Sequence, residues 1–135
     1  MDMLRFTKVS MNNSYELSYD ESSNCLFVAL FGLWDKMSQL DYYIDDIKAT
    51  ISHSKPSFNI IYDLTQYKGC ITQLTNLQVE AQNLLLAAGL NKTAVLIKEN
   101  QLLKASVEII FQMSGISATY FSNIGTLQNW LDSFK

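Results

Sequence analysis

The chain has 135 residues, a formal net charge of −3 and 48% hydrophobic residues, which are ordinary values for one globular domain with its own apolar core. Its ten basic residues are scattered singly, and this argues against the clustered lysines and arginines of nucleic-acid and anionic-membrane binding. No apolar run approaches the roughly 18 residues that a bilayer-spanning helix needs. We therefore expect a soluble, cytoplasmic protein with no transmembrane segment, no signal peptide and no nucleic-acid partner.

Cysteine and histidine usage gives no indication of a metal site. Cys25 lies inside a strand-like pattern, Cys70 follows a glycine, and His53 is the only histidine. The sequence has no CxxC or Cys/His spacing of the kind that zinc and thioredoxin-type sites use. Two reduced thiols are the expected state in a cytoplasmic protein, and we expect neither a metal nor a cofactor.

The N-terminal third of the chain indicates an arm followed by a hairpin. Residues 1–13 have no clear hydrophobic period and are predicted to form an N-terminal arm, which leaves residues 14–135 for the domain. Residues 14–20 alternate apolar and polar side chains like a half-buried strand, and residues 25–31 are the apolar run of a strand covered on both faces. The short polar link between the two runs predicts a β-hairpin.

Strands and helices alternate along the rest of the chain. Strands are predicted over residues 58–63, 92–98 and 117–121, and amphipathic helices over residues 38–52, 72–88, 101–114 and 123–134. Ser38 is the predicted N-cap of the first helix, and Gly89 suits the end of the second. Crossover helices return the chain in the same direction, so strands that alternate with helices build a parallel sheet. The order β-β-α-β-α-β-α-β-α predicts a single-domain α/β fold, with a mixed, mostly parallel five-stranded sheet and four helices.

The junction between Asp63 and Thr72 is the candidate functional site. Residues 58–63 form an apolar strand that ends at Asp63, and Thr72 begins the next helix nine residues later. A phosphate on Thr72 would meet the free N–H groups of the helix start and add about −2 charge to the surface. The simpler interpretation makes Thr72 the N-cap of that helix. Asp63 likewise either contacts a partner or caps its own loop.

The chain resembles the STAS family, and especially its SpoIIAA-like (anti-sigma-factor antagonist-like) members. The likeness covers residues 14–134 and rests on the element order and on residues 60–65, Ile-Ile-Tyr-Asp-Leu-Thr, which match a strand end of the regulatory members. In those members a phosphorylatable serine begins the next helix nine residues after the Asp, and Thr72 occupies that position. The family reads Asp-Ser-Ser-Gly there, whereas residues 71–74 read Ile-Thr-Gln-Leu, so the chain is more similar to the divergent SpoIIAA-like group.

The resemblance implies a non-catalytic regulatory or protein-interaction module, with Thr72 as a degenerate phosphoacceptor. It implies a protein partner that meets a switch-loop surface at this junction. The candidate residues of that surface are Asp63, Thr65, Tyr67, Lys68, Cys70 and Gln73. The residues themselves show no phosphate-cradling glycine loop and no triad-like set, so we expect no catalytic residues.

Aromatic residues suggest an alternative function. Trp34, Tyr42 and Tyr43 surround the start of the first predicted helix and could line an apolar groove that binds a small molecule or a lipid. Core packing is the commoner role of such side chains. The apolar run of residues 84–90 is predicted to be buried at the end of the second long helix, with a homodimer contact as the alternative.

Overall fold

In the computed structural model, which describes residues 5–134, six strands form one sheet in the order β1-β2-β3-β4-β5-β6. The strands are β1 (Thr7–Met11), β2 (Tyr15–Asp20), β3 (Cys25–Trp34), β4 (Phe58–Cys70), β5 (Leu90–Leu96) and β6 (Ala118–Phe121). The β1–β2 and β2–β3 pairs are antiparallel, whereas the β3–β4, β4–β5 and β5–β6 pairs are parallel. The α/β class and the mixed, mostly parallel sheet are confirmed.

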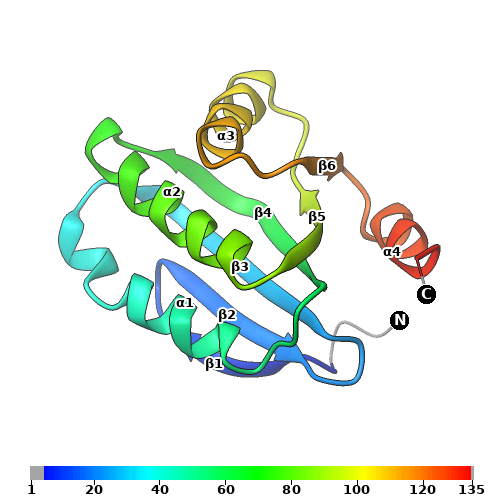
Figure 1. Cartoon of the computed structure of the whole chain (residues 1–135). Coiled ribbons are helices and arrows are strands. Elements are labelled where there is room, and N and C mark those ends of the chain that lie inside the picture. The colour runs from blue at the N-terminus through cyan, green and yellow to red at the C-terminus, as the bar shows by residue number, and fades with distance from the viewer. Residues whose placement is uncertain (1–4, 135) are drawn as a thin grey trace.

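The helices cover the two faces of the sheet unequally. They are the 3₁₀ helix η2 (Met37–Leu40) and the α-helices α1 (Tyr43–Ile51), α2 (Thr72–Ala87), α3 (Gln101–Ser114) and α4 (Ile124–Asp132). Buried side chains of α1, α2 and α3 share one core cluster, whereas Leu127 and Leu131 of α4 form a second cluster with Cys25, Ile61 and Ala94. Figure 1 shows α1 and α2 side by side over the sheet, and α4 apart from them beyond β6.

The prediction of five strands was one too few, because β1 lies within the segment predicted as an arm. Residues Thr7 to Met11 pair with β2, and the register shifts between Lys8 and Ser10. Thr7 and Ser10 therefore pair with residues on the same face of β2, namely Tyr19 and Leu17. This break in the alternation of faces removes the period of two that would reveal a strand in the sequence. Residues 1–4 of the predicted arm lie outside the described residues.

β4 is also longer than predicted. The prediction ended the strand at Asp63, which is where its pairing with β5 ends, opposite Leu96. Beyond that point β4 stays paired with β3 alone as far as the Trp34–Cys70 pair. Residues 66–69, Gln-Tyr-Lys-Gly, have the composition of a loop but form one side of this two-stranded ribbon. The segment predicted as a switch loop is therefore extended backbone.

The first predicted helix is two separate elements. Residues 37–40 form η2 and residues 43–51 form α1, and Ser38 lies exposed inside η2. Gln39 holds the start of η2 instead, because its Oε1 accepts hydrogen bonds from the backbone N–H groups of Asp35 (3.0 Å) and Lys36 (2.9 Å). The prediction that Ser38 is an N-cap was wrong.

Two polar side chains share the buried face of α2 with Leu74, Ala81 and Leu85. The buried residues include Gln78 and Gln82, whereas Leu77 and Leu84 are half-buried. Gln78 Nε2 donates to Tyr67 Oη (2.9 Å) and Gln82 Oε1 accepts from the Ser114 hydroxyl (2.6 Å), so each glutamine has a partner inside the core. At the end of α2, Leu85 is buried, whereas Leu86 is 37% exposed.

Candidate functional site

The start of α2 differs from the predicted N-cap arrangement. Ile71 is the N-cap residue, with extended backbone angles and no side-chain hydrogen bond to the helix, and Thr72 is the first helical residue. β4 ends at Cys70 and α2 begins at Thr72, so the N-cap position falls on the one residue between them. The N-cap interpretation of Thr72 was wrong. Its side chain is exposed at the end of the helix where backbone N–H groups lack intrahelical partners.

The Asp63 side chain forms hydrogen bonds within its own strand, β4. Its Oδ1 accepts hydrogen bonds from the backbone N–H of Thr65 (3.0 Å) and from the Thr65 hydroxyl (2.7 Å). Ala29 pairs with Asp63 and Phe31 pairs with Gln66, so β4 contains an extra residue here, and the Asp63 carboxylate satisfies the backbone of this bulge. Residues 64–70 of the extended ribbon lie between Asp63 and Thr72. Since a strand rises about 3.3 Å per residue, this ribbon keeps Asp63 and Thr72 apart in space.

The other predicted switch-loop residues divide between core and surface. Tyr67 is only 4% exposed, and its hydroxyl accepts from Gln78, so its assignment to a partner surface was wrong. Lys68 and Gln73 are exposed, and Thr65 is half-buried. Cys70 is half-buried, with Sγ 3.9 Å from the hydroxyl oxygen of Thr75.

Three exposed apolar side chains lie on the segments that meet at the start of α2. Leu33 is 48% exposed, Met37 is 61% exposed and Ile71 is 36% exposed. The Ile71 N–H donates to the backbone oxygen of Trp34 (3.0 Å), and Gln39 Nε2 donates to that of Leu33 (3.4 Å). These bonds bring the end of β3, η2 and the start of α2 together. We call Leu33, Met37, Ile71, Thr72 and Gln73 the α2-start surface.

The predicted aromatic groove does not form. Trp34 is 0% exposed and Tyr43 is 2% exposed, and their rings pack edge to face with centroids 5.1 Å apart. Trp34 Nε1 donates to the backbone oxygen of Ser14 (3.1 Å), which satisfies its polar group inside the core. Tyr42 alone is on the surface, at 71% exposed. Trp34 and Tyr43 are thus core residues, because they lie on the sides of β3 and α1 that face each other.

The histidine and the two cysteines give no indication of a shared catalytic or metal site. The exposed His53 ring stacks on Tyr19, with centroids 4.0 Å apart and planes 2° apart. No disulfide joins Cys25 and Cys70. In the described part of the chain, no group of three or more His, Cys, Asp or Glu side chains could hold a metal ion. Residues 5–134 also contain no helix that is long and apolar enough to span a bilayer.

A cavity that the sequence did not reveal lies at the carboxyl ends of β5 and β6. Its volume is about 530 Å³, and the residues that line it are Ile97, Lys98, Glu99, Asn100, Gln101, Lys104, Tyr120, Phe121 and Ser122. The first turn of α3 forms one wall, and the carboxyl ends of parallel strands are the usual ligand position in α/β sheets. The only sequence signal was the cluster of polar residues 98–101 that follows the β5 strand.

Lys104 and Tyr120 lie side by side in the lining of this cavity. Lys104 Nζ lies 5.1 Å from the centroid of the Tyr120 ring, within cation–π range. Burial, and then the nearby Glu108 carboxylate, raises the pKa of Tyr120 to about 12. The phenol therefore stays neutral at pH 7, and the charged side chains of the lining are Lys98, Glu99 and Lys104.

The fold has a counterpart among solved structures. The chain is similar to an uncharacterized protein of the DUF3478 family from Shewanella loihica PV-4, which is described as having a SpoIIAA-like fold, with a TM-score of 0.55. The two chains are 13% identical, and the alignment covers 93% of this chain and 91% of the other. The sequence matches no protein-family model and no curated protein. The fold that the resemblance predicted is confirmed, and the chain is a divergent domain with a SpoIIAA-like fold.

Proposed function

We propose that this protein is a non-catalytic regulatory module that binds a protein partner through the α2-start surface. The observation that carries this proposal is the exposure of Leu33, Met37 and Ile71 around one helix start. Exposed apolar side chains on neighbouring segments are typical of protein-binding surfaces, and the bonds to the backbone oxygens of Trp34 and Leu33 make these segments neighbours. The SpoIIAA-like fold supports the same function, because the family resemblance implies an interaction module.

The backbone around this surface is already fixed. Leu33 and Ile71 are held by the β3–β4 ribbon and by the Ile71 N–H bond to Trp34. A partner that buries these side chains therefore loses little backbone entropy of this chain. Burial contributes about 25 cal/mol per Å² of apolar area to the binding free energy. Three such side chains therefore make a moderate contribution to the affinity, which suits a reversible regulatory complex.

The interaction is tested by charge substitutions on the α2-start surface. Ile71→Asp should abolish capture of partner proteins from a lysate of the source cell, because it places a carboxylate in the apolar contact. Leu102→Asp is the matched control, since Leu102 is 87% exposed on α3, outside this surface. Circular dichroism checks that both variants are folded. Equal capture by wild type and Ile71→Asp would remove this proposal.

Thr72 is the proposed regulatory residue of the surface. Its exposed hydroxyl lies beside the free N–H groups of the first turn of α2, where a phosphate is electrostatically favourable. Thr72→Glu should change the affinity for a partner identified by the capture experiment, measured by calorimetry, without lowering the melting temperature. Thr72→Ser is the control and should bind like wild type. An unchanged affinity for Thr72→Glu would end the role of Thr72 as a switch.

The cavity beside α3 favours a second candidate function, which is the binding of a small anionic molecule. Its volume of about 530 Å³ is within the range of ligand pockets. Lys98, which precedes α3, and Lys104, in its first turn, supply positive charge, and Tyr120 supplies an aromatic face. This position replaces the apolar groove that the aromatic residues predicted.

Titration with pyrophosphate, followed by NMR or calorimetry, tests the anion site. Wild type should bind, and the double variant Lys98→Ala/Lys104→Ala should bind at least about tenfold more weakly, because each charge-assisted hydrogen bond contributes roughly 1.5–3 kcal/mol. Lys48→Ala is the control, since Lys48 is exposed on α1. Absence of binding to wild type, or equal weakening in Lys48→Ala, would contradict this function.

A further inference from the structure

A small cavity lies between β4, α2 and α3. Its volume is about 10 Å³, which is about the minimum that holds one water molecule. The polar residues of its lining are Tyr62, Tyr67, Gln78 and Gln82, and apolar side chains such as Val107 of α3 complete it. Most of the lining is apolar, so a polar occupant has to be inferred from the hydrogen-bonding groups among these residues.

Tyr62 supplies the observation that identifies the occupant. Its hydroxyl oxygen is fully buried and has no hydrogen-bond partner among residues 5–134, while its ring packs edge to face on Phe111 with centroids 5.3 Å apart. Burial raises the pKa of Tyr62 above its ordinary value, so the phenol keeps its proton and remains a donor. A buried donor without a partner is rare and destabilising.

Each of the two glutamines of the lining is oriented by one hydrogen bond and keeps a second polar atom that can form another. Gln78 donates through Nε2 to Tyr67 Oη (2.9 Å), and its Oε1 is a carbonyl acceptor. Gln82 accepts through Oε1 from the Ser114 hydroxyl (2.6 Å), and its Nε2 carries two N–H donors. The lining therefore provides both donors and acceptors, on β4 and on α2.

We propose that one internal water molecule occupies this cavity as a permanent part of the fold. It accepts a hydrogen bond from the Tyr62 hydroxyl and exchanges hydrogen bonds with the side-chain amides of Gln78 and Gln82. The cavity volume excludes any larger ligand. The water joins β4 to α2. This inference is independent of the proposed function.

Water-to-protein NOE and ROE measurements on the full chain test this site. Wild type should show cross-peaks from a long-lived water to the methyl groups of Val107 and Ile110, which line the cavity. Tyr62→Phe should lose these cross-peaks and lower the melting temperature by about 2–5 °C, because the hydroxyl that holds the water is removed.

Tyr15→Phe is the matched control. The Tyr15 hydroxyl donates to Asp46 Oδ2 (2.7 Å) beside α1, so its removal should also lower the melting temperature but leave the water cross-peaks intact. Three results would each overturn the inference: no long-lived water in wild type, water cross-peaks retained in Tyr62→Phe, or an unchanged or raised melting temperature in that variant.

Discussion

Replacement of Trp34 by alanine should lower the free energy of unfolding by about 3–5 kcal/mol. The indole is 0% exposed and contacts the rings of Tyr43 and Tyr67, with centroids 5.1 and 6.2 Å away. Its removal leaves a large cavity and also takes the Nε1 donor from the backbone oxygen of Ser14. Urea unfolding, followed by circular dichroism, measures the loss as a lower midpoint at unchanged slope.

The control for this experiment is Tyr42→Ala, at a neighbouring aromatic that is 71% exposed. It should change stability by no more than about 0.5 kcal/mol. The comparison separates core packing from an aromatic groove. A groove residue would lose ligand binding at nearly constant stability, so a Trp34→Ala protein as stable as wild type would contradict the core assignment.

Leu127→Ala should lower the free energy of unfolding by about 2–5 kcal/mol. Leu127 is 0% exposed and anchors α4 in the second core cluster, against Ile61 and Ala94 of the central strands. α4 is the one described helix on this face, so no neighbouring helix can close the cavity that alanine leaves. Hydrogen exchange should become faster in α4 first, because its docking depends on this contact.

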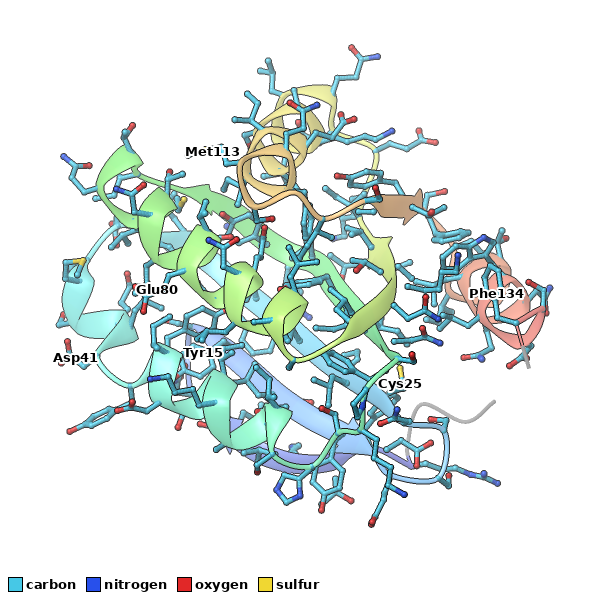
Figure 2. The ribbon with its side chains drawn as sticks, in the orientation of Figure 1. Tyr15, Cys25, Asp41, Glu80, Met113 and Phe134 are labelled. Atoms are coloured by element: carbon cyan, nitrogen blue, oxygen red, sulfur yellow. The ribbon has the colours of Figure 1, made fainter. Side chains whose placement is uncertain are left out.

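Ile124→Ala on the same helix is the matched control, because Ile124 is 41% exposed. Its effect should be well below that of Leu127→Ala. Figure 2 shows Phe134, just after α4, and Asp41, just after η2, at opposite ends of the molecule, so a folded Leu127→Ala protein should keep its partner binding at the α2-start surface. Equal exchange rates in α4 of wild type and Leu127→Ala would contradict the anchoring role.

Hydrophobic periodicity along the chain was enough to predict the helices whose packing does not depend on strand register. The predicted helices over residues 101–114 and 123–134 correspond to α3 (Gln101–Ser114) and α4 (Ile124–Asp132). Each has an apolar stripe, and the structure shows that Asn100 and Asn123 cap α3 and α4. These two caps were not predicted, whereas the predicted caps Ser38 and Thr72 do not form, because a cap depends on where the tertiary structure starts the helix.

The candidate site was harder to predict because it depends on bulges in β4. Leu64 faces the main core, and so does Tyr67, three residues later. The register shift opposite Ala29 and Phe31 makes this change of side, which no alternation rule anticipates. Tyr67 was therefore assigned to the surface although it is core, and the exposure of Leu33 beside Ile71 was not predicted.

The sequence by itself determined the α/β class, the order of strands and helices from residue 14 onward, and the resemblance to a SpoIIAA-like fold, because apolar periodicity is a local property of the chain. The tertiary structure alone decided the sixth strand, the length of β4, the burial of Trp34 and the cavity beside Lys98 and Lys104. The physical reason is pairing: a strand edge, a bulge and a pocket wall exist only when residues distant in the sequence meet, and their side chains then point to whichever face the partner strand dictates.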